Sequence, residues 1–292
     1  MNNSAPQFYE YEGDGREPVS QALTDAGVLI VTLNRPRRRN AWNEEMELGY
    51  YEAIDRAVAD ASVRSIVVTG AGENFCPGMD VELLRQITRD GRTYMSERRP
   101  QTLLRLVPKP VVAAVSGLCA GIGFVQAVMA DVRFTTADAK WSTAFSRIGL
   151  VAEDGVCWRL QRLCGDGAAA DMLLSSRAIS GTEAVSVGLA NRVVEQADLL
   201  RAAVDYATDL AQRSPSSMAL IKQQLLLDAD DSAESSRHRA VRLLALAKSL
   251  PDYAEGVRAL SEKTHPRFEG LPSHYGYLSL REPTSPSAQR TT

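Results

Sequence analysis

Three short β-branched runs, each followed by a loop and a helical pattern, constrain the fold of this chain more than any other feature. The runs are Val28–Leu33, Ser65–Thr69 and Val111–Val115. Asn34 and Pro36 end the first run, as breaker residues end a strand. Short apolar strands that alternate with helices are typical of an α/β core whose sheet is covered on both faces. The sequence therefore predicts such a sheet.

Helical patterns occupy the stretches between and after these strands. The first has apolar positions that recur at helical spacing: Leu48, Tyr51, Ile54, Val58 and Ala61. From about residue 198 helices follow one another, beginning at Leu199, Ser217 and Ser232. We therefore divide the chain into a polar N-terminal extension (1–26), a core (27–197), a helical region (198–270) and a flexible, proline-containing tail (271–292).

Composition excludes several classes of protein. The chain has 292 residues, of which 45% are hydrophobic, enough for one large domain or a domain with a helical appendage. A net charge of −3 does not indicate a nucleic-acid surface. The four cysteines lack the spacing of a zinc site or disulfide framework. No run has the length of a membrane span and the amino terminus lacks a secretion signal, so we expect a cytoplasmic protein.

Two glycine-bearing segments, Asn74–Asp80 and Ser116–Phe124, each follow a β-branched run and open a helical pattern. A helix start leaves amide N–H groups unsatisfied and carries partial positive charge. Glycine also lets the backbone approach a ligand closely. Taken singly, each segment is better explained as a plain strand-to-helix turn. Together they predict an oxyanion hole, in which main-chain N–H groups stabilise an oxygen that becomes negative during reaction.

The chain resembles the crotonase, or enoyl-CoA hydratase/isomerase, superfamily from about residue 28 to residue 270. The resemblance rests on motifs in family order: LNRP from Leu33 with NA at 40–41, FCPGMD from Phe75, PVVAAVSG from Pro110 leading into AGIG, Asp131, and HPRFEG from His265. It implies an α/β spiral of ββα units that binds acyl-CoA, with a C-terminal helical region that packs subunits into trimers or dimers of trimers. It further implies that the thioester carbonyl accepts hydrogen bonds from the N–H groups of Met79 and Ile122, in turns made possible by Gly78 and Gly121.

The positions that carry the two catalytic glutamates of hydratases in this superfamily correspond to Val125 and Phe145. Neither residue can move a proton, so classical hydration loses its acid and base, and the acyl pocket becomes apolar. A different carboxylate pair, Glu153 and Asp154, follows soon after. Glu153 matches the catalytic aspartate of dienoyl-CoA isomerases and of the 4-chlorobenzoyl-CoA dehalogenase, and this match slightly favours it.

Asp154 matches the aspartate of a ring-opening β-diketone hydrolase and of an isomerase of phenylacetate breakdown. The residues themselves also allow a structural role, because an acidic pair before a helix can cap its first turn. Both explanations, proton transfer and capping, stay open for Glu153 and Asp154 at this point.

A basic run near the first strand suits the phosphates of coenzyme A. Arg35, Arg37 and Arg38 carry guanidinium groups that bind phosphate in bidentate fashion, although a solvated basic turn explains them equally well. The resemblance adds Lys263 and Phe268, which reach the nucleotide of a neighbouring subunit. The sequence has no Walker loop and no His/Cys cluster, so we expect no cofactor beyond the CoA of the substrate.

These features predict an enzyme that stabilises a thioester enolate and moves a carbon–carbon double bond. Noncanonical hydration of an enoyl-CoA, acyl-CoA hydrolysis, carbon–carbon bond hydrolysis and nucleophilic displacement are alternatives within the same fold. An alternative of another class is a catalytically silent acyl-CoA-binding or assembly protein.

Overall fold

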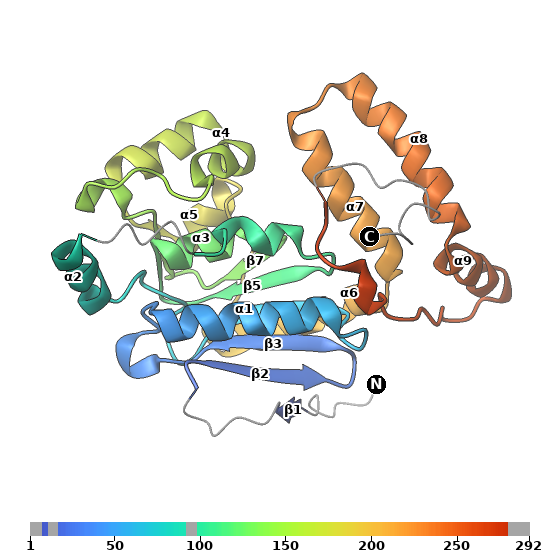
Figure 1. Ribbon diagram of the computed structural model, residues 1–292, viewed down its shortest axis with the longest axis horizontal. Helices are drawn as coiled ribbons and strands as arrows, with labels where there is room; N and C mark the ends of the chain where they lie inside the picture. The colour runs from blue at the N-terminus through green and yellow to red at the C-terminus, as the bar shows by residue number, and fades with distance from the viewer. Residues whose placement is uncertain (1–7, 11–16, 92–97, 280–292) are drawn as a thin grey trace.

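The computed structural model describes residues 8–10, 17–91 and 98–279, and Figure 1 shows their arrangement. Within these residues the larger sheet has seven strands in the order β1-β2-β3-β4-β5-β7-β10. Its members are β1 (Phe8–Glu10), β2 (Val19–Thr24), β3 (Val28–Leu33), β4 (Ser65–Gly70), β5 (Val111–Val115), β7 (Val132–Thr135) and β10 (Arg192–Val193). The pairs β1–β2 and β2–β3 are antiparallel, and every later pair in the sheet is parallel. Parallel neighbours require crossover connections, which the helices supply.

A smaller sheet and the helices complete the described chain. The smaller sheet has the order β6-β8-β9 and contains β6 (Leu118–Ala120), β8 (Lys140–Ser142) and β9 (Ile179–Ser180). The α-helices are α1 (Glu44–Ala59), α2 (Val81–Asp90), α3 (Ile122–Met129), α4 (Val156–Ser175), α5 (Gly181–Ser186), α6 (Leu199–Ala211), α7 (Pro215–Leu227), α8 (Ala233–Ser249) and α9 (Pro251–Glu262). Short 3-10 turns are η1 (Pro36–Arg38), η2 (Gln101–Leu106), η3 (Phe145–Ile148), η4 (Gln196–Asp198), η5 (Asp228–Asp230) and η6 (Ser273–Tyr275).

The predicted strands are apolar throughout because helices cover both faces of the sheet. Val31 of β3 and Val68 of β4 belong to one buried cluster with residues of α1 and α3. Their neighbours Ile30 and Val67 face the other way, into a cluster with Ala203 and other residues of α6. Successive side chains of a strand point to opposite faces, so a strand buried on both sides needs apolar residues at every position. The predicted α/β class is confirmed.

Local signals account for where the first helix lies. The Asn43 side chain accepts a hydrogen bond from the Met46 N–H at 3.0 Å and caps the amino end of α1. The predicted apolar positions Tyr51, Ile54 and Val58 are buried, whereas Leu48 is 66% exposed. Ala61, also predicted on this face, lies beyond the end of α1 and is exposed. The helical periodicity therefore identified the buried face of α1 apart from Leu48 and Ala61.

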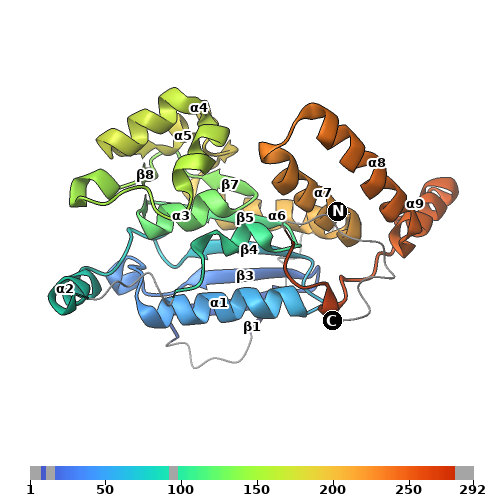
Figure 2. The same ribbon diagram turned by 45° about the horizontal axis from the view of Figure 1, so that its top comes forward.

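The predicted helical region is confirmed and contains α6, α7, α8 and α9. Figures 1 and 2 show that α7, α8 and α9 form an arm beside the sheet, on the side away from α2. Large apolar side chains on this arm remain exposed: Ile221, Leu225, Val241, Leu244, Val257 and Leu260. Such residues suit the packing of one chain against another, and the trimer itself stays a prediction.

The two ends of the chain carry more structure than the sequence pattern indicated. Both β1 and β2 lie within the segment 1–26 and extend the sheet beyond β3. At the other end, Leu271 and Leu278 are buried in a small cluster with Ala219 of α7. The rest of the predicted tail, 280–292, lies outside the described residues, as do 1–7 and 11–16.

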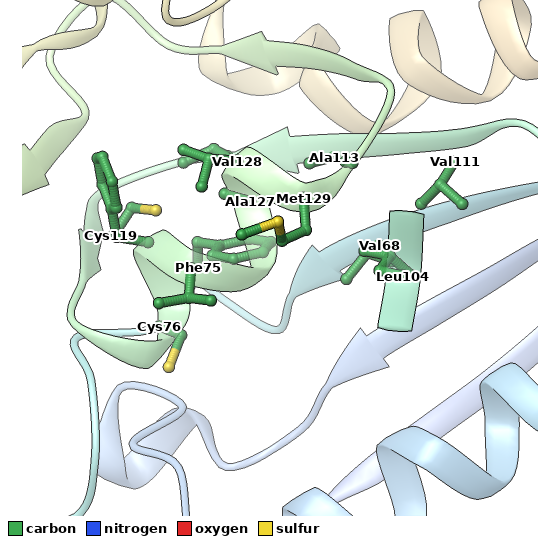
Figure 3. Packing of buried hydrophobic residues seen from close by; sticks show 14 of the residues in the cluster. Val68, Phe75, Cys76, Leu104, Val111, Ala113, Cys119, Ala127, Val128 and Met129 are labelled. Carbon is green, nitrogen blue, oxygen red and sulfur yellow. The ribbon is translucent and has the colours of Figure 1, made fainter. Parts of the chain in front are cut away.

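One cluster of buried side chains connects the sheet to the turns described below. Figure 3 shows part of it, with Cys76 and Cys119 beside the ribbon of α3. Each of these cysteines precedes a turn glycine by two residues.

Of the helices described, not one has the length and apolar character to cross a membrane.

Candidate functional site

The two glycine turns predicted from the sequence lie against each other. The Cys76 N–H donates to the Leu118 carbonyl, and the Ala120 N–H donates to the Cys76 carbonyl, both at 2.9 Å. This pairing brings Gly78 and Gly121 together: a Cβ built on Gly121 would lie 3.5 Å from the Gly78 Cα. Gly78 has φ of 113° and Gly121 has φ of 51° with ψ of −124°, values that residues with a side chain rarely adopt.

The first turn leaves the Met79 N–H free to bind a ligand. The Trp42 N–H donates to the Gly78 carbonyl and the Asp80 N–H donates to the Trp42 carbonyl, both at 2.8 Å. Successive peptide groups in an extended segment point in opposite directions, so the Met79 N–H points away from Trp42. It finds no acceptor among the described residues.

The second turn presents an N–H in the same way. Ile122 is the first residue of α3, and the helix's first backbone bond runs from the Val125 N–H to the Gly121 carbonyl at 3.0 Å. The Ile122 N–H is therefore one of the unsatisfied donors of a helix start, and no acceptor for it lies in the described part of the chain. Two unpaired donors in two adjacent glycine turns are consistent with the predicted oxyanion hole, which stays a prediction.

Side chains near the first strand hold the first turn in place. Asn40 is buried and donates to the Asn74 carbonyl at 2.6 Å and to the Ala71 carbonyl at 3.0 Å. The Arg35 guanidinium forms an ion pair with Asp80 at 3.0 Å, directly after Met79. Arg35 therefore supports the turn, whereas Arg37 and Arg38 are exposed on η1.

The wall next to these turns is apolar, as the sequence predicts. Val125 is completely buried in α3 and Phe145 is 4% exposed at the start of η3. Both belong to the same buried cluster as Ile122, and Ala152 packs against that cluster. Ala152, which directly precedes Glu153, therefore packs against the cluster that contains Val125 and Phe145.

Glu153 and Asp154 are both half-buried in the loop between η3 and α4. Burial raises the pKa of each carboxyl above its ordinary value. The neighbouring Asp154 charge raises the pKa of Glu153 further, and the charge of Glu47 does the same for Asp154. Arg98 opposes both shifts, and the main chain of Gln101 also lowers the pKa of the Asp154 carboxyl.

The alternative that these carboxylates cap the following helix does not fit the structure. The N-cap of α4 is Gly155, with φ of 68°, and no side chain in the described chain accepts a capping hydrogen bond there. Asp154 itself adopts a left-handed backbone with φ of 50°. Two half-buried carboxylates without a capping role are consistent with proton transfer.

A buried polar layer that joins α1, α3 and residues 98–101 was missed by the reasoning from sequence. Glu47 of α1 accepts hydrogen bonds from the Arg98 Nε at 2.9 Å and from the Trp42 indole N–H at 2.9 Å. The Gln126 amide donates to the Gln101 side-chain oxygen at 2.6 Å. One signal was available, since Glu47 lies on the buried face of α1 and Gln126 interrupts an otherwise apolar helix.

Lys263 and Phe268 lie apart from the turns within one chain. Lys263 follows the last turn of α9 and is exposed. The Phe268 carbonyl accepts a hydrogen bond from Arg64 at 2.8 Å. Figure 1 shows α9 at the opposite end of the molecule from α2, which begins just after Asp80. The role of these two residues at the nucleotide of a neighbouring subunit stays a prediction.

The profile of the enoyl-CoA hydratase/isomerase family matches residues 24–271. The chain is 32% identical to 1,2-epoxyphenylacetyl-CoA isomerase of Escherichia coli K12 over 253 residues, covering 84% of this chain and 96% of that protein. A crystal structure of an enoyl-CoA hydratase from Polaromonas sp. JS666 superposes with a TM-score of 0.80 at 27% identity, covering 86% of this chain and 99% of the other.

An enoyl-CoA hydratase from Mycobacterium marinum is 42% identical, with a TM-score of 0.64 and coverage of 74% of this chain and all of that one. These similarities confirm the resemblance inferred from the LNRP, FCPGMD and AGIG motifs. The chain belongs to the enoyl-CoA hydratase/isomerase, or crotonase, superfamily.

Proposed function

We propose that the protein shifts a carbon–carbon double bond in an acyl-CoA by moving one proton through a thioester enolate. One observation carries the proposal: a half-buried carboxylate pair with raised pKa values directly follows Ala152, which packs against the apolar cluster that contains Val125 and Phe145. A carboxylate with a raised pKa can both accept and return a proton near neutral pH.

The reaction balances with protein groups alone. A carboxylate of the pair removes a proton from C2 of a 3-enoyl-CoA, and the electron pair delocalises onto the thioester oxygen. The N–H groups of Met79 and Ile122 stabilise that oxyanion. The carboxylic acid then returns the proton to C4, which yields the 2-enoyl-CoA and restores the carboxylate. Glu153 and Asp154 are the residues to which we assign this transfer.

Exposed basic residues support recognition of the CoA moiety. Arg37 and Arg38 lie on the surface of η1, next to the turn that Arg35 supports. Their guanidinium groups suit the phosphates of CoA. In the trimer or dimer of trimers that we propose, Lys263 and Phe268 of a neighbouring subunit complete the nucleotide site, and no further cofactor takes part.

Noncanonical hydration is the second candidate, because two adjacent carboxylates can also hold and activate a water molecule. The named relatives include both an isomerase and hydratases. Hydrolysis of the thioester or of a carbon–carbon bond would use the same oxyanion hole.

The products formed from 3-hexenoyl-CoA and 2-hexenoyl-CoA separate these reactions. Isomerisation converts the first into the second with no change of mass, and we expect this result. Hydration of the second adds one water, and hydrolysis of either releases a free thiol. Binding of both esters without any product would overturn the proposal in favour of a catalytically silent acyl-CoA-binding protein.

A further inference from the structure

The last residues that the structure describes, 271–279, form a strap that runs from the helical arm back to the core. The family profile ends at residue 271, so the strap lies almost entirely outside the region that the profile matches. We propose that Tyr277 of this strap is a positioning residue, which acts through Asp55 and Arg99 to hold η2 against α3. This inference rests on the proposed function, because α3 begins with one of the two predicted oxyanion donors.

The strap is fastened to the arm near both of its ends. Leu271 and Leu278 are 3% and 5% exposed and pack with Ala219 of α7. The Gln223 side chain, also on α7, donates a hydrogen bond to the Ser279 carbonyl at 2.9 Å. Figures 1 and 2 show η6, which lies within the strap, beside α1 of the core. The strap therefore joins the arm to the core.

Tyr277 closes a clasp around Arg99. The Tyr277 hydroxyl donates to the carboxylate of Asp55, and the Arg99 guanidinium donates to both oxygens of the same carboxylate at 2.6 and 2.9 Å. The Arg99 Cζ lies 4.9 Å from the ring centroid of Tyr51 and 6.0 Å from that of Tyr277. Exposed ion pairs contribute little singly, whereas a bidentate pair within a network keeps a defined geometry. The clasp therefore fixes the position of Arg99.

The strap holds η2 at both ends. Arg99 lies two residues before η2, and at the other end the Leu106 carbonyl accepts a hydrogen bond from the Leu278 N–H at 2.7 Å. Gln101 connects this held segment to α3. Its amide donates to the Arg99 carbonyl at 3.2 Å, and its side-chain oxygen accepts a hydrogen bond from Gln126 at 2.6 Å. A continuous set of contacts thus runs from the strap to α3.

The path ends at the predicted oxyanion donor. Gln126 lies one turn after Ile122, the first residue of α3, so a shift of Gln126 moves the Ile122 N–H with it. An oxyanion donor works at about 2.7–3.1 Å from the oxygen, and a misplacement of about 1 Å can lower a rate ~100-fold. Tyr277 acts only through other residues, which distinguishes it from the groups that touch the substrate.

Tyr277→Phe tests the proposal, because it removes the hydroxyl and keeps the ring. We expect kcat for 3-hexenoyl-CoA to fall ~10- to 100-fold with KM nearly unchanged, since the oxyanion contact strengthens only in the transition state. Asp55→Asn should have the same effect, and the double variant should be no slower than the slower single variant, because both changes open one clasp.

Tyr275→Phe is the matched control in the same strap. The Tyr275 ring packs beside the cluster of Leu271, and its hydroxyl has no hydrogen-bond partner among the residues that the structure describes. This variant should therefore keep the kcat of the wild type. An equal loss of kcat in Tyr275→Phe and Tyr277→Phe would overturn the role assigned to the clasp.

Hydrogen exchange of the main-chain amides, followed by mass spectrometry, tests the same path without turnover. Peptides that cover η2 and the start of α3 should exchange about tenfold faster in Tyr277→Phe than in the wild type, and peptides of α8 should not change. This result decides the positioning role even if 3-hexenoyl-CoA is not a substrate and the proposed function fails. Faster exchange confined to the strap and α7 would overturn the proposal, because the strap would then fasten only the arm. Wild-type kcat in Tyr277→Phe would overturn the link to the oxyanion hole and leave the proposed function standing.

Discussion

Replacement of Gly123 by alanine should disable the oxyanion hole without touching a charged group. A Cβ on Gly123 would lie 2.3 Å from the Cys76 carbonyl oxygen and 2.6 Å from the Cys76 Cβ. Real Cβ contacts are at least 3.0 Å, so the start of α3 must move from the segment around Cys76 by about 0.7 Å. That segment leads to Met79, and Ile122 directly precedes Gly123.

The displacement converts into an expected loss of rate. Oxyanion donors work at about 2.7–3.1 Å from the oxygen, and a further ~0.7 Å exceeds the reach of a good hydrogen bond. Loss of one such donor costs about 100- to 1,000-fold in kcat. Overpacking of this kind also destabilises a core by about 1–3 kcal/mol.

The assay compares kcat for 3-hexenoyl-CoA, calorimetric binding of a CoA ester and thermal unfolding. Gly167→Ala in α4 is the matched control, because its new Cβ would have no atom within 4 Å. Gly167 is exposed and follows the kink of α4 at Gly165 by two residues, so its replacement should change neither kcat nor the melting temperature appreciably. A Gly123→Ala protein with wild-type kcat and melting temperature would refute the reasoning.

Three further results are expected. Calorimetry should detect binding of hexenoyl-CoA and not of free hexenoic acid, because Arg37 and Arg38 are assigned to phosphates; equal affinities would refute this. Light scattering should give three or six times the chain mass of 31.8 kDa, and a single-chain mass would contradict the subunit packing proposed for α7, α8 and α9. Asp154→Asn should gain stability relative to the wild type as pH rises. The reason is that the pKa of Asp154 is raised in the folded chain, so the wild type loses stability as the pH passes from the ordinary carboxyl range through the raised pKa. A difference in melting temperature between the two proteins that stays constant from pH 4 to pH 7 would contradict this prediction.

The parts of the fold that follow from local patterns could be predicted. Val28–Leu33 is apolar at nearly every position because helices cover both faces of β3, and this pattern distinguishes a central strand. The starts of α2 and α3, at Val81 and Ile122, follow from glycine turns and an Asp80 cap. In contrast, β2 lies near the edge of the sheet and has the sequence VSQALT. Its polar residues do not alternate regularly with apolar ones, so the sequence did not predict a strand there.

The polar layer could not be predicted, because its contacts join residues that are far apart in the chain. Glu47 and Arg98 are separated by 51 positions, and Gln101 and Gln126 by 25. Nothing local indicates that such residues meet. The capping alternative likewise depended on a backbone angle, since only the left-handed conformation of Gly155 shows which residue begins α4.

Exchange of the C2 protons of 3-hexenoyl-CoA with deuterated water tests the central claim most directly, because it detects the enolate itself. Mass spectrometry should show deuterium incorporation by the wild type and about 100- to 10,000-fold slower incorporation by Asp154→Asn. Free 3-hexenoic acid should not exchange. Tight binding of the CoA ester without any exchange by the wild type would contradict the account.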